Sequence, residues 1–268
     1  MNNDALFGRY WAADSLVHNL DPRTKLLGTF ALVIITFSAN GFLAIFLAGA
    51  AILALFEIAH IPLAQAFRSI LPLVFIIVLS ALFNLFFVRG GTVYVDLGWL
   101  TISSEGIRMA VFIAIRLTLL LLSGSLLTLT TTTLDITEAF EYLLSPLRKY
   151  NVPVHEFAMV MGIALRFLPQ FVDEFRTIRA AQISRGARLA SSPTKSGLSS
   201  LTSLLVPLFT SAFRHADTLS AAMDARCYHG AENRTRLRPL KFSDYDAYAV
   251  CALMVVLTLV VLVGALVP

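Results

Sequence analysis

Long apolar runs without charge alternate with polar segments along the chain. The clearest run covers residues 247–267 and holds no charged residue over its 21 positions. A helix of that length is about 31 Å long, which matches the hydrocarbon thickness of a bilayer. Two further runs, 70–88 and 107–130, have a similar length, and the second carries Arg116 inside it. The pattern predicts a membrane-spanning helix in each of the three regions.

A longer apolar run covers residues 26–56. As one helix it would measure about 46 Å, too long for a hydrocarbon core of about 30 Å. The middle of the run, at 38–41, contains Asn-Gly, which is a turn signal. We therefore predict two helices here, over about 24–39 and 42–59.

These helices give a predicted membrane domain over residues 1–131 with four spans, and a final transmembrane helix over 246–268. Residues 89–106, between the third and fourth spans, contain glycines and alternate in part between polar and apolar positions. That pattern predicts a small extracellular hairpin. The intervening segment, 132–245, is then a predicted cytosolic domain.

The segment 132–246 holds 14 of the 21 Lys and Arg residues, yet it also contains apolar stretches at 157–168 and 198–213. Both stretches are short for a span and suit amphipathic helices at a membrane surface. We expect Pro207 and Arg214 to limit the second stretch. If both stretches crossed the membrane, the chain would have seven spans instead of five.

Cation-rich helices are expected over 170–190 and 208–227 at the cytosolic face. Splitting the 26–56 run into two helices places 18 of the 21 Lys and Arg residues on one side of the membrane. The positive-inside rule favours that arrangement. The amino terminus is then cytoplasmic and the carboxyl terminus extracellular.

Composition agrees with a lipid-facing surface. Hydrophobic residues make up 57% of the 268 residues, charged residues only 14%, and the mean hydropathy is +0.76. Soluble domains carry about 25% charged residues. The same figures exclude a disordered chain, a collagen-like fibre and a disulfide-stapled secreted module.

The net charge of +4 and a pI near 9.3 are compatible with nucleic acid, an anionic membrane face or acidic partners. The cations are interleaved with apolar runs and lack an aromatic platform, which disfavours nucleic acid. The sequence contains no phosphate-binding loop, no zinc-protease motif and no nucleophile elbow. No catalytic or metal-ligating residue is therefore predicted.

An imperfect repeat lies inside the cation-rich segment. Residues 180–187 and 221–228 share the pattern Ala-Ala-x-x-x-Arg followed by a small residue. Each copy is expected to close a helix, with Gly186 as a carboxyl cap in the first and Gly230 in that role a turn later in the second.

The repeated arginines, Arg185 and Arg226, have two interpretations. An arginine near a helix carboxyl terminus is stabilised by the helix dipole, which explains the repeat as two well-capped helices. Alternatively, the two side chains project beyond the helix ends and bind carboxylates on a partner through their forked guanidinium groups.

These signatures resemble the paired Ala-Arg-Gly motifs of the CbiQ/EcfT family, the transmembrane component of energy-coupling factor transporters. The resemblance covers almost the whole chain. Two departures are Ser184, where the family often has Ala, and Cys227, where Gly is usual. Further matching segments are Phe7-Gly8-Arg9-Tyr10, Leu20-Asp21-Pro22-Arg23-Thr24-Lys25-Leu26, Leu144-Ser145-Pro146-Leu147, Arg166-Phe167-Leu168-Pro169 and Phe213-Arg214-His215-Ala216-Asp217.

The resemblance implies an all-α integral membrane protein of about five transmembrane helices with long amphipathic cytosolic coupling helices, together L-shaped. It implies a bacterial cell membrane location and a scaffold that couples two ABC-type ATPase subunits (EcfA and EcfA′-like) to an interchangeable substrate-binding S subunit. The chain would be no enzyme and would bind no cofactor, because ATP and Mg are bound by the ATPase partners. The amino-terminal match indicates the shared, vitamin-type version.

Carried over to this sequence, Arg185 and Arg226 are the ATPase-docking arginines and Gly186 ends the first docking helix, after Ser184. Ala181 and Ala225 are the positions of close approach. The expected seat for the S subunit is apolar: Phe157, Met161, Leu165, Leu201, Leu205 and Leu208.

Two alternatives remain. A dedicated cobalt or nickel version would share the fold and the docking motifs. An autonomous secondary transporter would need Gly- or Pro-broken midplane helices in two repeated halves, and the repeat here lies in the cation-rich segment instead. An intramembrane cation such as Arg116 suggests a functional role. The structural alternative is snorkelling or a hydrogen bond to a neighbouring span, with Asn84 as a candidate partner.

Overall fold

The protein divides into two compact units that are described separately. The bundle unit comprises residues 8–139 and 238–268, and the crossed-helix unit comprises 1–7 and 140–237. The computed structural model describes residues 10–11, 13–96, 101–150, 152–186, 196–230, 240 and 242–266.

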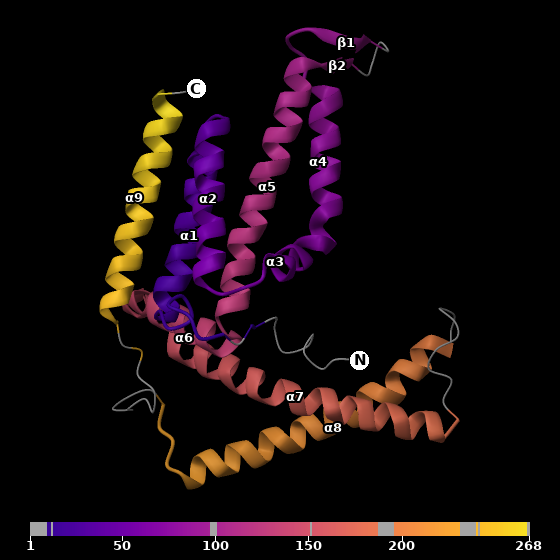
Figure 1. Ribbon diagram of the computed structural model, residues 1–268. Coiled ribbons are helices and arrows are strands. Elements are labelled where there is room, and N and C mark those ends of the chain that lie inside the picture. Colours follow the sequence, from indigo (N-terminus) through magenta and orange to yellow (C-terminus); the bar gives the residue numbers. More distant parts are fainter. Residues whose placement is uncertain are drawn as a thin grey trace. The chain divides into compact units, whose positions relative to one another are not determined.

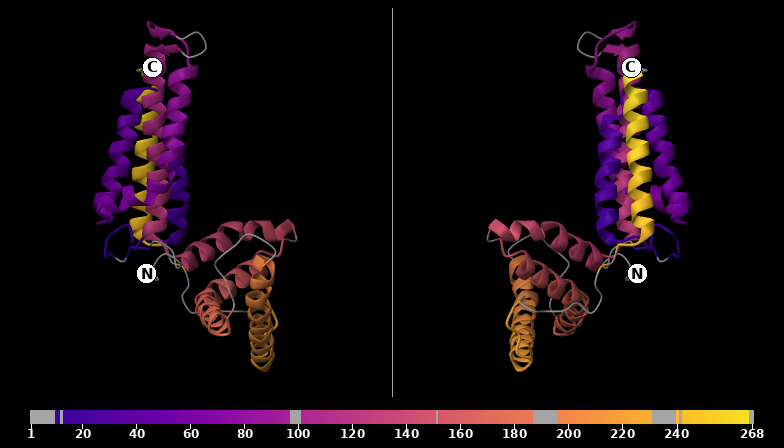
Figure 2. Two further views of the ribbon diagram at one scale, coloured as in Figure 1. Left: turned by 90° about the vertical axis from the view of Figure 1, so that its right-hand side faces the viewer. Right: turned by 90° about the vertical axis from the view of Figure 1, so that its left-hand side faces the viewer.

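The bundle unit is almost entirely helical, which confirms the predicted all-α class. Its long helices run side by side, and a two-stranded antiparallel hairpin joins α4 to α5 (Figures 1 and 2). The hairpin agrees with the one predicted within 89–106. The elements are α1 Pro22–Ser38, α2 Phe42–Ile58, α3 Leu63–Ile70, a 3₁₀ turn Leu71–Leu73, α4 Val74–Phe87, β1 Val93–Asp96, β2 Thr101–Ser103, α5 Ser104–Thr130 and α9 Asp244–Leu266.

Three helical stretches in the described residues are long and apolar enough to cross a membrane: Leu63–Phe87, Ser104–Thr130 and Asp244–Leu266. The helix α2 is equally apolar but has only 17 residues, as does α1. The helical stretches agree with the predicted spans in position. The count of five spans stays a prediction.

The turn between α1 and α2 confirms the break predicted at 38–41. Gly41 has a φ of +85° and directly precedes α2. Only glycine adopts this conformation without a steric penalty, so it reverses the chain between two apolar helices. The two helices then lie against each other and against α5 and α9.

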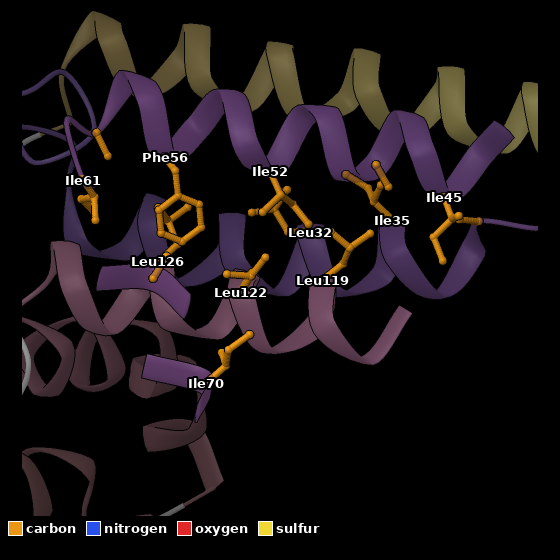
Figure 3. Close-up of a cluster of buried hydrophobic side chains, with 14 of the residues drawn as sticks. Leu32, Ile35, Ile45, Ile52, Phe56, Ile61, Ile70, Leu119, Leu122 and Leu126 are labelled. Carbon is orange, nitrogen blue, oxygen red and sulfur yellow. The ribbon is translucent and has the colours of Figure 1, made fainter. Parts of the chain in front are cut away.

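The core of the bundle unit lies where α1, α2 and α5 meet (Figure 3). Phe56, Ile35 and Ile52 are fully buried there, and large apolar side chains from α5 complete the layer. The outer faces of the same helices carry large exposed apolar residues, such as Phe46 at 73% exposure. A buried apolar face together with an exposed apolar face is typical of a membrane bundle.

The start of α1 is tied to the start of α9. Asp21 caps α1 by accepting the backbone N–H of Arg23, and Pro22 is the first helical residue, as predicted. The carboxylate of Asp246 in turn accepts the backbone N–H groups of Asp21 (2.9 Å) and Ser243 (2.7 Å). This link joins two segments that are 225 positions apart in sequence.

Arg116 donates to the end of α1, so the hydrogen bond to a neighbouring helix is confirmed, but the candidate partner Asn84 is wrong. One guanidinium nitrogen donates to the carbonyl of Ala39 at 2.6 Å, and the group lies 4.6 Å from the ring centroid of Phe112. Asn84 instead donates to the Ser80 carbonyl of its own helix. Ala39 is the carboxyl cap of α1, where unpaired carbonyls and the helix dipole favour a cation.

The crossed-helix unit is built on two long helices, α7 Val154–Ser184 and α8 Ser196–Ala225, which cross and pack on each other (Figures 1 and 2). The boundary between the two units falls within α6 Thr133–Leu144, which is followed by a 3₁₀ helix, Ser145–Tyr150.

The helices predicted over 170–190 and 208–227 start too late, because α7 begins at Val154 and α8 begins at Ser196 and continues through Pro207. Pro169 likewise lies inside α7. A proline inside a helix removes one backbone hydrogen bond and costs about 3 kcal/mol. Tertiary packing between the two helices offsets such a cost, which the sequence pattern does not reveal.

Candidate functional site

The end of α7 carries the first copy of the repeat. Arg185 is the carboxyl cap, and its backbone N–H donates to the carbonyl of Ala181 at 3.1 Å. Gly186 follows with a φ of +86° and donates to the Ile183 carbonyl at 2.9 Å. The predicted helix ending at Gly186 is thereby confirmed: a left-handed residue turns the chain away and satisfies a terminal carbonyl.

The end of α8 carries the second copy, and Cys227 takes the position of Gly186. Cys227 has a φ of +53°, and its N–H donates to the Asp224 carbonyl at 2.9 Å. The N–H of Tyr228 donates to the Met223 carbonyl at 3.1 Å. These two bonds form a Schellman motif.

The sequence prediction that Gly230 caps this helix a turn later is therefore wrong. Gly230 also has a positive φ, of +93°, but the bonds that close α8 are made by Cys227 and Tyr228. A cysteine in the left-handed region is strained by about 1 kcal/mol or more relative to glycine. The two copies nevertheless share a positive-φ residue directly after the arginine, and the N–H of that residue donates to the carbonyl three positions earlier.

Both signature ends are open to solvent. Arg185, Arg226, Ala181 and Ala225 are all exposed, as is Ser184, whose hydroxyl donates to the carbonyl of Ala180 (3.1 Å). In the part of the chain that the structure describes, neither signature guanidinium makes an ion pair or a side-chain hydrogen bond. By contrast, Arg176 of α7 pairs with Asp173 at 3.3 Å. Two exposed guanidinium groups beside small alanines can donate hydrogen bonds to the carboxylates of a partner.

A polar cluster joins α7 to α8 where they cross. Glu174 of α7 accepts the hydroxyl of Ser211, and its other carboxylate oxygen lies 3.5 Å from Nε2 of His215. The His215 ring stacks on Phe167 and meets Phe171 edge-on, both at a centroid distance of 6.0 Å. Gln170 of α7 also lies close to His215, with 3.2 Å between their Nε2 atoms, so polar side chains link the two helices at several points.

The expected S-subunit seat is only partly an exposed surface. Phe157 is 65% exposed and Leu205 is 43% exposed, while Leu165 and Leu208 are half-buried. Met161 is 36% exposed, between these two groups. The side chain of Leu201 lies outside the described residues.

Sequence reasoning missed a more exposed apolar row on α8. Val206, Phe209 and Phe213 are exposed by 63%, 58% and 68%, respectively. Their spacing of three and four residues places them on one helix face, which is the signal that could have found them. Three large apolar side chains exposed in a row are typical of a partner-binding or membrane-contacting surface.

The polar links also escaped sequence reasoning. On α7, Glu174 lies four positions after Gln170, so the two share a helix face. On α8, Ser211 and His215 are related in the same way. Nothing in the sequence says that the two faces meet. Within the described residues, no group of three or more His, Cys, Asp or Glu side chains could hold a metal ion.

Comparison with known proteins identifies the family of the chain. The sequence model of the CbiQ family, described as cobalt transport protein, matches residues 13–237. An energy-coupling factor transporter transmembrane protein EcfT from Ruminiclostridium cellulolyticum is 42% identical over 267 residues, covering 98% of each chain. A protein of the same name from Heliobacterium modesticaldum is 44% identical over 93% of each chain. Another, from Bacillus subtilis, is 37% identical over 97% of this chain and 98% of the relative.

The family match and the full-length identities extend over both units, including the apolar helices of the bundle and the two signature ends. The chain therefore belongs to the CbiQ/EcfT family and is a membrane-embedded component of an energy-coupling factor transporter.

Proposed function

We propose that this chain is the scaffold and energy-coupling subunit of an importer driven by two ABC-type ATPase subunits. In this proposal the chain transmits the ATP-driven movement of these subunits to a small substrate-capturing membrane protein. The chain itself hydrolyses nothing and holds no cofactor, since ATP and Mg are bound by the ATPase partners. The bundle unit spans the membrane, with a cytoplasmic amino terminus and an extracellular carboxyl terminus.

The observation that carries the proposal is the pair of matched helix ends. Arg185 and Arg226 follow the last residues of α7 and α8, each is followed by a residue of positive φ, and both are exposed. A capping role alone requires no arginine at these positions, because the caps are made by backbone groups of Gly186 and Cys227. Two equivalent docking ends suit two related partner subunits.

The crossing of α7 and α8 offers a route for transmission. Glu174, Ser211 and His215 join the helices through side chains, so movement of one helix end is carried to the other helix. The apolar side chains of Phe157 on α7 and of Leu205, Val206 and Phe209 on α8 supply a surface for the substrate-capturing protein. An apolar surface with few directional contacts suits interchangeable partners.

The cargo in this proposal is a vitamin or similar micronutrient. The relatives that match over the full chain are named for the energy-coupling factor itself and for no substrate. A dedicated cobalt or nickel component is the second candidate, because the matching family model is described as cobalt transport protein. The substrate-capturing partner distinguishes the two.

Copurification of the tagged chain from its own membranes tests the proposal. We expect two ABC-type ATPase chains and at least one small membrane protein at stoichiometric ratio, identified by mass spectrometry. Ligand extracted from that small protein would name the cargo class. A chain that purifies without any ATPase, while remaining monodisperse, would contradict the coupling function.

A further inference from the structure

The bundle unit contains an apolar cavity of about 240 Å³ among α1, α2, α5 and α9. An apolar cavity of about 150 Å³ is already large enough to bind benzene. Pockets that take whole drug-sized ligands start near about 300 Å³. The cavity therefore has room for part of an apolar molecule, such as a segment of a hydrocarbon chain. Its wall includes Leu32, Leu55, Leu126, Leu253 and Val256.

The cavity opens sideways between α2 and α9. Ala54 of α2 and Ala252 of α9 both line it and are exposed. Near its carboxyl end, α9 packs closely on the turn between α1 and α2: a Cβ atom on Gly264 would lie 3.3 Å from the backbone of Asn40. The small alanine side chains thus leave a lateral mouth on helices whose outer surfaces are apolar.

One charged group lines the cavity. Lys25 donates from Nζ to the carbonyls of His18 (2.7 Å) and Thr130 (3.1 Å). An ammonium has three N–H donors, so one is left after these two bonds. In the part of the chain that the structure describes, Lys25 makes no ion pair. Of the three nearby carboxylates, those of Asp21 and Asp246 accept backbone N–H groups, and that of Asp135 accepts the hydroxyl of Thr132.

We propose that this cavity is a lipid-binding site, in which one acyl chain of an anionic phospholipid enters between α2 and α9 and its phosphate pairs with Lys25. The chemistry of the wall selects a hydrocarbon tail, and the lateral mouth lets that tail enter from the bilayer. The volume admits a part of one chain, so the remainder of the lipid stays in the membrane. Lys25 is the one charged residue among those that line the cavity, so a negative headgroup complements this wall better than a neutral one.

Native mass spectrometry of the full-length chain in mild detergent tests this site, with phosphatidylglycerol as the probe and phosphatidylcholine as the neutral comparison. We expect one retained phosphatidylglycerol per chain and about fivefold weaker retention of phosphatidylcholine. The substitution Lys25→Met should remove that preference. Equal retention of the two lipids by the unchanged protein would overturn the headgroup assignment.

A second pair of variants locates the lipid independently of Lys25, which also supports the fold. Ala51 lines the cavity, whereas the neighbouring Ala50 is exposed and does not. We expect Ala51→Phe to abolish lipid retention and Ala50→Phe to leave it unchanged. Equal retention by both variants would show that the bound lipid lies elsewhere and would overturn the proposal.

Discussion

The carboxylate of Asp246 accepts the backbone N–H of Asp21 at 2.9 Å, so the first turn of α9 holds the first turn of α1. Asp246 is 3% exposed and also accepts the N–H of Ser243. The bond closes the bundle by joining its last helix to its first. The buried backbone N–H of Asp21 and the N–H of the exposed Ser243 both depend on this one side chain.

The change Asp246→Ala should therefore destabilise the protein by about 2 kcal/mol. The buried N–H of Asp21 would lose its acceptor while staying out of contact with water. Asp244→Ala is the matched control: Asp244 lies in the same turn of α9 but is exposed. Thermal unfolding of the full chain in detergent measures both. Equal midpoints for the two variants would contradict the link.

Arg116 is expected to act in folding rather than in transport. Its bond to the Ala39 carbonyl and its stacking on Phe112 fix the end of α1 against α5. Arg116→Met should lower the unfolding free energy by about 1 kcal/mol, in the range of polar contacts between membrane helices. Uptake per folded complex should be unchanged, and a loss of uptake at normal folded yield would assign Arg116 to the transport path.

The cap of α8 should tolerate glycine better than cysteine. Cys227→Gly removes the strain of a left-handed cysteine and should stabilise that helix end by up to about 1 kcal/mol. Gly186→Ala should destabilise the end of α7. An added Cβ would meet no atom within 4 Å there, so the effect comes from the positive φ alone. Hydrogen exchange at the two helix ends measures both effects. Faster exchange after Cys227→Gly would contradict the cap assignment.

The contact between Glu174 and Ser211 should hold the crossing of α7 and α8. Glu174→Ala is expected to speed hydrogen exchange along both helices, because the hydroxyl and the His215 ring lose their shared partner. Asp173→Ala is the control, since Asp173 is exposed and pairs only at the surface with Arg176. Identical exchange in the two variants would mean that apolar packing alone fixes the crossing.

The helices themselves were largely predictable from the sequence, because an uncharged run of about 20 residues has few alternatives to a membrane helix. The Asn-Gly turn before α2 and the glycine cap of α7 carry local signals of the same strength. The partners of Arg116 and Asp246 had no such signal, since each contacts a backbone group far away in sequence. Any residue type offers a carbonyl or an N–H, so sequence does not mark these partners.

The candidate site likewise has features that the sequence predicted and features that it did not. The repeat identified Arg185 and Arg226 because equivalent ends share a residue pattern. The cap at Cys227 was assigned to Gly230, because residue propensity favours glycine at positive φ and says nothing of a strained exception. The continuation of α7 and α8 through proline depends on packing between the helices, which only the structure describes.

Charge reversal at the two signature ends tests the central claim most directly. The double variant Arg185→Glu with Arg226→Glu is compared with Arg176→Glu with Arg179→Glu, which changes the net charge equally on exposed positions of α7. The measurement is the ATPase-to-scaffold ratio in the detergent-solubilised complex, with circular dichroism confirming intact helices. We predict a fall of more than about tenfold for the signature variant alone. Stoichiometric ATPase retained by the signature variant would contradict the docking role of both arginines.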